Sequence, residues 1–211
     1  IIGILAAIII PTVSKVREAA KAAHCKSNLR QIGTAAAMYA NDNKDLIVPV
    51  MKLGIEGDRR LTSYWTGQLS PYMSYKGNIG DWVLFPSYEI MPVYICPASQ
   101  VQSTNVDAGT VQSRLFGYGY NYNYLSYEAR KVYYNQVSSP AKVVFITDEE
   151  DAKYAGRDWK PYVRYPDGGT DYIVSHRHPS ATANILWLDG HVTAEKKTGE
   201  ALKDTTLWKV N

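Results

Sequence analysis

The sequence has little net charge and few motifs that carry chemistry. Its 23 basic and 20 acidic residues leave a formal net charge of +3, which is too small to favour binding to nucleic acid. It contains no glycine-rich phosphate loop, no nucleophile elbow, no paired catalytic motif and no Cys-x-x-Cys pair. These absences argue against an enzyme and against a zinc site of the usual spacing.

The composition is that of a folded protein. Apolar residues make up 45% of the 211 residues, which excludes a disordered, collagen-like or coiled-coil chain and is enough for one domain with a core. Tyrosine supplies 17 of the aromatic residues, beside 5 tryptophans and 3 phenylalanines. No internal repeat or low-complexity linker divides the chain.

The first ten residues, Ile1 to Ile10, are all apolar and are followed by Pro11. As a helix they cover ~15 Å, about half of a bilayer's hydrocarbon core, so this run alone does not span a membrane. The run fits a core strand, the rear of a signal peptide, or the second half of a longer membrane helix. Because Pro11 leads directly into a helical pattern, a signal peptide is the least favoured. With no initiator Met, we expect a processed chain or a sequence cut at its front.

A long helix is predicted from Thr12 to about Asn43, and its apolar face changes sides along its length. The change indicates that the front half packs on a membrane or on neighbouring subunits, while the rear half packs on the chain's own domain. The alternative is that the change of face is accidental in an alanine-rich helix. The front stripe is Val13, Val16, Ala20 and Ala23, and the rear stripe is Cys25, Leu29, Ile32, Ala36 and Tyr39.

Several segments together resemble a known family. The segments 1–11, 15–19, 25–33 and 38–43 resemble the N-terminal helix of type IV pilin-like proteins and type II secretion pseudopilins. Further segments resemble the C-terminal "prepilin-type processing-associated" region: 95–97, 118–121, 145–148, His178 and 189–192. Two features depart from the family: its opening stretch, with a methylated N-terminus and a membrane-buried Glu, has no counterpart here, and one extra residue separates His178 from Asp189.

The resemblance implies a non-enzymatic subunit of a helical filament, either a type IV pilus-like fibre or a type II secretion pseudopilus. Such a subunit waits in the inner membrane, is handled by prepilin peptidase and the inner-membrane assembly machinery, and ends in a periplasmic or extracellular filament of identical copies. We expect residues 1–24 to protrude and residues 25–211 to form the globular part. The residues predicted to mediate assembly, with Pro11 forming a kink, are Ile1, Ile2, Ile4, Leu5, Ile8, Ile9, Ile10, Pro11, Val13 and Val16.

The two cysteines, Cys25 and Cys96, are predicted to form a disulfide, because an even count in an exported chain favours one. The alternative is two buried free thiols.

The expected fold class is α+β, with the long helix packed on a small antiparallel sheet that carries long loops. Strands are predicted at 93–96, 142–147, 172–174 and 184–188, and a short helix within 63–73. Asp189-Gly190 predicts a type I′ hairpin turn, and 42–60 is expected to be a loop.

Two groups of side chains are candidate metal sites. Clustered carboxylates suit calcium, so Asp148, Glu149, Asp151 and Asp158 are a candidate set, with a solvated acidic turn as the alternative. His176, His178 and His191 with Asp189 are a weaker candidate for a metallohydrolase centre.

Tyrosines recur at Tyr118, Tyr120, Tyr122 and Tyr124, with further ones at Tyr127, Tyr133 and Tyr134. Core or interface packing is the ordinary interpretation of this spacing. A tyrosine-rich surface on a membrane-anchored extracytoplasmic binding module is the alternative function.

Overall fold

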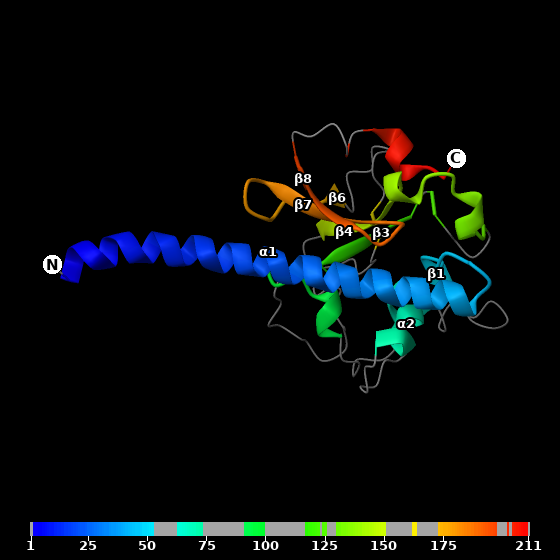
Figure 1. The fold of residues 1–211 in the computed structure, drawn as a ribbon, viewed down its shortest axis with the longest axis horizontal. Helices are drawn as coiled ribbons and strands as arrows, with labels where there is room; N and C mark the ends of the chain where they lie inside the picture. The colour runs from blue at the N-terminus through cyan, green and yellow to red at the C-terminus, as the bar shows by residue number, and fades with distance from the viewer. Residues whose placement is uncertain are drawn as a thin grey trace, which may run out of the picture.

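The dominant element of the computed structural model is helix α1, Ile2–Asp42, which contains 41 residues. The structure describes residues 2–52, 63–73, 91–99, 117–122, 124–125, 130–150, 162–163, 173–197, 202 and 204–210. The rear half of α1 lies across the globular part, and its front half projects beyond it (Figure 1). α1 runs through Pro11 without a break, so the proline does not end the helix; the kink expected there stays a prediction. Within these ranges, no helix combines the length and the apolar character that a membrane crossing requires.

A sheet of six strands lies against α1 (Figure 1). Its central strands are antiparallel in the order β3-β4-β7-β8, with bounds Tyr118–Asn121, Val144–Glu150, Thr182–Trp187 and Val192–Lys196. β6, Ile173–Val174, pairs antiparallel with β4. β5, Tyr162–Val163, pairs with β3 in parallel, which departs from the fully antiparallel sheet that the sequence suggested.

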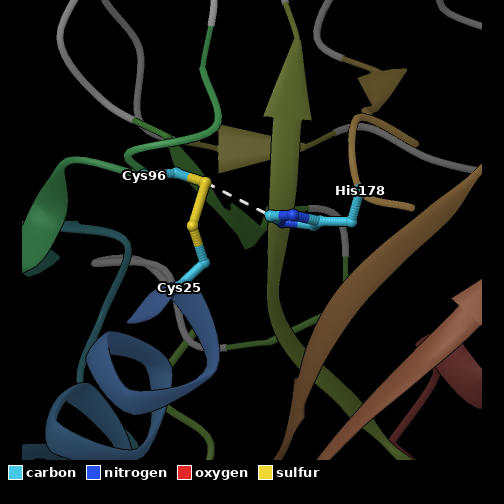
Figure 2. Close-up of side chains that lie close together, drawn as sticks. All are labelled: Cys25, Cys96 and His178. Atoms are coloured by element: carbon cyan, nitrogen blue, oxygen red, sulfur yellow. Dashed lines mark hydrogen bonds between the residues drawn. A yellow bond between two sulfur atoms is a disulfide. The ribbon is translucent and has the colours of Figure 1, made fainter. Parts of the chain in front are cut away.

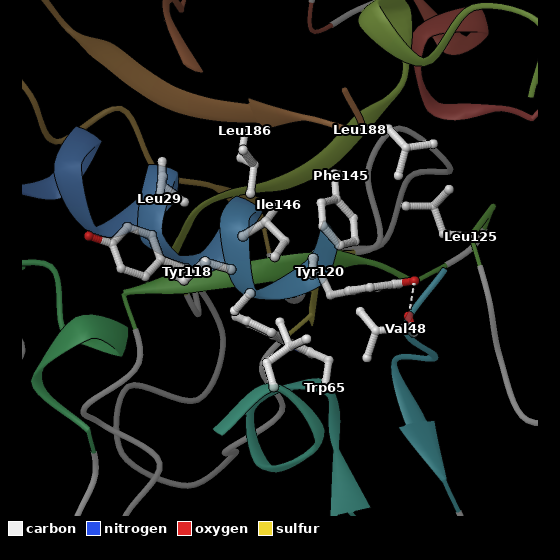
Figure 3. Packing of buried hydrophobic residues seen from close by; sticks show 14 of the residues in the cluster. Leu29, Val48, Trp65, Tyr118, Tyr120, Leu125, Phe145, Ile146, Leu186 and Leu188 are labelled. Carbon is white, nitrogen blue, oxygen red and sulfur yellow. Dashed lines mark hydrogen bonds between the residues drawn. The ribbon is translucent and has the colours of Figure 1, made fainter. Parts of the chain in front are cut away.

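The two faces of the sheet bury different cores because successive side chains of a strand point to opposite faces. In β7, Leu186 lies in the core under α1, whereas Ile185 and Trp187 lie in a second core with Trp208. The register of β4 shifts between Val144 and Ile146, as a β-bulge does. This shift explains why both Phe145 and Ile146 belong to the core under α1 (Figure 3).

One row of paired residues crosses the four central strands. Tyr120 in β3 pairs with Ile146 in β4, which pairs with Leu186 in β7. Leu186 in turn pairs with Val192 in β8, and all four side chains contact the core that α1 covers. A stripe of apolar side chains on a helix buries its surface best against such a continuous apolar row.

Short elements also pack against the core. β1, Met51–Lys52, pairs with β2, Ser63–Tyr64, and α2, Trp65–Leu69, follows directly. Trp65 is fully buried, and its ring lies 5.4 Å from that of Tyr94. The 3-10 helices are η3, Ser70–Met73; η4, Pro92–Tyr94; η5, Tyr134–Gln136; η6, Pro140–Lys142; and η7, Thr205–Trp208.

The α+β class is confirmed, and so is the long helix on a largely antiparallel sheet. The strand predicted at 93–96 is wrong, because Pro92 starts the 3-10 helix η4 there. The type I′ turn is also wrong: of the two residues only Gly190 has a positive φ, of 94°. Trp187 and His191 close a three-residue connection instead, a form in which a single left-handed glycine suffices.

Candidate functional site

The projecting segment of α1 exposes apolar side chains. Between residues 10 and 24, no side chain is buried. Ile10 is 69% exposed, Val16 is 62% exposed and Val13 is 40% exposed. For the predicted assembly residues 1 to 9, the side chains lie outside the described part. The other four, which include Pro11, are all exposed. Ile10, Val13 and Val16 form an apolar surface that the described part of the chain leaves uncovered, and we call these three residues the front surface.

The rear stripe of α1 is buried as the sequence predicts. Cys25, Leu29 and Ile32 are fully buried, Ala36 is 2% exposed, and Tyr39 is half-buried against the same core. Cys25 is the first buried residue of α1 after residue 9, so the change of environment falls at this residue. The change of apolar face therefore falls where the helix enters the globular part.

Cys25 and Cys96 form a disulfide, as predicted, and join α1 to the segment after η4. A polar network that the sequence analysis missed surrounds this bond. Asn28, one turn after Cys25, is buried and donates from Nδ2 to the carbonyl of Ile95 at 3.1 Å and to Tyr118 Oη at 3.4 Å. The sequence did hold a signal for Asn28, because it is a polar residue at i+3 from Cys25 on an otherwise apolar stripe.

Gly117 allows Cys96 to reach the helix. A Cβ atom on Gly117 would lie 2.6 Å from the backbone nitrogen of Cys96, closer than real Cβ atoms come. The amide of Gly117 donates to the carbonyl of Tyr94, and its carbonyl accepts from Glu149 N. The glycine thus lets two backbone segments meet beside the disulfide.

A buried histidine and a buried aspartate lie next to the disulfide. His178 Nε2 lies 3.0 Å from Asp148 Oδ2 and 3.8 Å from Cys96 Sγ. Asp148 Oδ2 also accepts from the backbone amide of Asn184 at 2.6 Å, which ties β4 to β7. Both side chains are 1% exposed or less. Sequence reasoning placed Asp148 and His178 in separate candidate sites and did not pair them.

The proposed metallohydrolase cluster is not brought together. His178 precedes β7 and is buried, while Asp189 and His191 lie in the connection that follows β7 and are exposed. His191 Nδ1 is 2.5 Å from Asp189 Oδ1, and its ring stacks on Trp187 at 5.5 Å between centroids. β7 alone spans ~20 Å, so these groups cannot hold one ion.

Of the four candidate calcium ligands, Asp151 and Asp158 lie outside the described residues. Asp148 and Glu149 are successive residues of β4, so their side chains leave the strand on opposite faces. Asp148 is directed at His178 and Asn184 inside the protein. The calcium set therefore stays a prediction.

Tyr118 and Tyr120 are fully buried, so the core-packing interpretation of the tyrosine series is confirmed for them. Tyr120 donates its hydroxyl to the carbonyl of Val48 at 2.7 Å (Figure 3). Tyr122 and Tyr124 are half-buried, and Tyr127 lies outside the described part. The tyrosine-rich binding surface is thus wrong for the first two of its members.

In comparison with known proteins, a family model described as a protein of unknown function (DUF1559) matches residues 14–77. The matched stretch covers less than half of the chain. It includes the exposed Val16, the buried rear stripe of α1 and the elements from β1 to η3. No curated protein and no solved structure matches the chain.

Proposed function

We propose that this protein is a structural subunit of a helical filament of the type IV pilus or type II secretion pseudopilus kind. Copies of the chain assemble through the front half of α1, and the globular part decorates the outside of the filament. The protein acts by packing against its own copies, and no reaction is assigned to it.

The observation that carries this proposal is the front surface on a helix that projects from the globular part. Burying an isoleucine or valine side chain fully stabilises an association by about 1.5–3 kcal/mol. An exposed apolar surface on a projecting helix is therefore a site of association with lipid or with other helices. A bundle of projecting helices would cover the front surface of every copy.

The attachment of α1 to the globular part suits this role. The disulfide at Cys25 and the buried hydrogen bonds of Asn28 lie where the exposed half of the helix ends. Force applied along the projecting half would pass to the segment after η4 through the disulfide and to β3 through the hydrogen bonds of Tyr118. A piston or a fibre needs such a connection, whereas a flexible tether does not.

The partners and location follow from the sequence resemblance. We propose that the chain is held in the inner membrane before assembly, is processed by prepilin peptidase, and then enters a periplasmic or extracellular filament. The machinery that performs the transfer would recognise the front half of α1.

The test replaces two members of the front surface, Ile10 and Val16, with aspartate in the full natural chain. Met38→Asp is the matched control, because Met38 is 51% exposed on the rear half of the same helix. Filaments are examined by electron microscopy of material sheared from the producing cells, and the subunit is quantified in the sedimented fraction.

We expect Ile10→Asp and Val16→Asp to abolish sedimentable filaments while the disulfide and circular dichroism spectrum stay unchanged. Met38→Asp should assemble like the unmodified chain. Normal filaments from both front variants, or a natural chain that stays monomeric when its membrane is removed, would refute the proposal.

A further inference from the structure

Three side chains that can bind a metal converge inside the protein, at the point where α1 meets the sheet. Figure 2 shows Cys25 on α1, Cys96 on the segment after η4 and His178 on the segment before β7. One ligand atom from each of the three residues lies within 4.8 Å of the others, and all three residues are buried. In the oxidised protein the two sulfur atoms are bonded to each other.

The distances around His178 Nε2 match those between the ligands of a tetrahedral metal ion. With Zn–S near 2.3 Å and Zn–N near 2.0 Å, sulfur and nitrogen ligands stand about 3.6 Å apart. Cys96 Sγ lies 3.8 Å from His178 Nε2. Asp148 Oδ2 lies 3.0 Å from the same nitrogen. For a nitrogen and an oxygen that bind one zinc ion, a separation of about 3.3 Å is expected.

Once reduced, the two cysteines need only a small movement to become ligands. Two thiolates on one tetrahedral zinc stand about 3.8 Å apart. The Cα atoms of Cys25 and Cys96 are 5.2 Å apart, so rotation of the two side chains can supply this separation. The backbone can stay where it is.

Contacts other than the disulfide hold the three ligands in place. Asn28 and Tyr118 fix α1 at Cys25, and the carbonyl of Ile95 accepts from Asn28 next to Cys96. His178 pairs with Thr182 through two backbone hydrogen bonds. Reduction of the disulfide therefore leaves the ligand set assembled.

The buried pair is not fully satisfied by its surroundings. In the part of the chain that the structure describes, Asp148 Oδ1 and His178 Nδ1 are buried without a hydrogen-bond partner. A buried carboxylate oxygen without a partner is uncommon, and an unassigned ion is one of its explanations, so Asp148 Oδ1 is available as a ligand. The ring nitrogen that faces Cys96 Sγ is Nε2, and a sulfur atom beside a nitrogen atom favours a metal that binds both.

We propose that the reduced protein binds one thiophilic divalent metal ion of the zinc class through Cys25 Sγ, Cys96 Sγ and His178 Nε2, with Asp148 as the fourth ligand. Binding releases the two thiol protons, and the proton on Nε2 moves to Nδ1 of the ring.

A disulfide oxidant, R–S–S–R, converts the reduced, metal-bound protein back to the oxidised, metal-free protein. The two thiolates give up two electrons and form the Cys25–Cys96 bond, the oxidant becomes two thiolates, and the metal leaves because two ligands are lost. The same cysteines thus bind a metal ion in the reduced protein and form a disulfide cross-link in the oxidised protein.

The test titrates the full chain with Co²⁺ and then Zn²⁺, without oxygen, after reduction by a phosphine that does not bind metal. Thiolate-to-cobalt charge-transfer absorption and the d–d bands of tetrahedral cobalt report the site. His178→Gln keeps an N–H group for Asp148 and removes the nitrogen ligand. His191→Gln is the matched control at the exposed pair. Cys25→Ser removes one sulfur.

We expect one equivalent of metal in the reduced chain and none in the oxidised chain, with release when a disulfide oxidant is added. His178→Gln should weaken binding at least about tenfold, Cys25→Ser should weaken it further, and His191→Gln should leave it unchanged. X-ray absorption of the zinc form of the unmodified chain gives a check without variants, and should show two sulfur ligands together with nitrogen or oxygen. The absence of saturable binding, equal affinity in His178→Gln, or a sulfur-only ligand shell would overturn the proposal.

Discussion

Tyr118 donates its buried hydroxyl to the backbone carbonyl of Cys25, 3.3 Å away. The first residue of β3 thereby holds α1 at the residue where the helix becomes buried. The same hydroxyl accepts a hydrogen bond from Asn28, so one phenol links two successive turns of the helix to the sheet. This contact is one of several that hold α1 on the globular part at the point where its front half begins to project.

Tyr118→Phe should destabilise the protein by about 1–2 kcal/mol, because it removes both hydrogen bonds and keeps the ring. Thermal and urea unfolding of the oxidised protein measure the change. Tyr39→Phe, which removes a hydroxyl from the half-buried end of α1, is the comparison and should cost less. Equal stability of Tyr118→Phe and the natural chain would show that the network contributes nothing.

The disulfide should contribute about 4 kcal/mol to the free energy of unfolding, because it closes a loop between residues 71 apart in sequence. Urea unfolding of a Cys25→Ala, Cys96→Ala double variant against the oxidised chain gives this difference. The natural chain unfolded with reductant and a metal chelator should behave like the double variant. A loss below about 1 kcal/mol would contradict the expectation.

Gly117→Ala should destabilise the protein by about 1–3 kcal/mol, because the new methyl group overlaps the backbone of Cys96. Gly190→Ala is a contrasting variant: nothing lies within 4 Å of its Cβ position, and only its positive φ opposes the substitution. Its cost should be about 1–2 kcal/mol, with no effect on the disulfide. The rate of disulfide formation after reduction should fall for Gly117→Ala alone.

The two histidine–aspartate pairs should differ in their effect on stability. His178→Ala removes the histidine from the buried Asp148 side chain, which keeps only the Asn184 amide, and should cost about 3–5 kcal/mol. His191→Ala removes an exposed pair and should cost less than about 1 kcal/mol. Urea unfolding at neutral pH gives both values, and similar losses would argue against the importance of burial.

Alkaline pH should destabilise the fold through its tyrosines. Burial, and after it the charge of Asp189, raises the pKa of Tyr134 to about 12 from the ordinary 10.0. Burial likewise raises the pKa of Tyr94 and of Tyr118 above the ordinary range. Because the unfolded tyrosines ionise near pH 10, the stability from these groups is complete below pH 10 and is lost as pH rises toward 12 and beyond.

Tyrosinate absorbance against pH, together with thermal unfolding between pH 9 and 12, checks this expectation. Tyr134→Phe should lose less stability than the natural chain over this interval. Uniform ionisation of all tyrosines near pH 10 in the folded protein would contradict the assigned pKa shifts.

The rear stripe of α1, the α+β class and the Cys25–Cys96 bond could all be predicted from sequence. The stripe depends on a local periodicity of 3.6 residues per turn, which requires no knowledge of the partner surface. The strand predicted at 93–96 failed because Pro92 favours the start of a helical turn, and this local preference overrode an apolar run. The type I′ turn failed because loop length, which only the strand register reveals, selects the turn type.

The sequence by itself determined which parts of α1 are apolar and where the face changes, because these are properties of neighbouring residues. Only the tertiary structure decided that Asp148 and His178 meet beside the disulfide, since they come from strands and turns that are far apart along the chain. Their pairing depends on the register of β4 against β7, and no local pattern encodes that register. The buried Asp148–His178 pair therefore depends on pairing between strands, while the exposed apolar surface of α1 depends on helical periodicity.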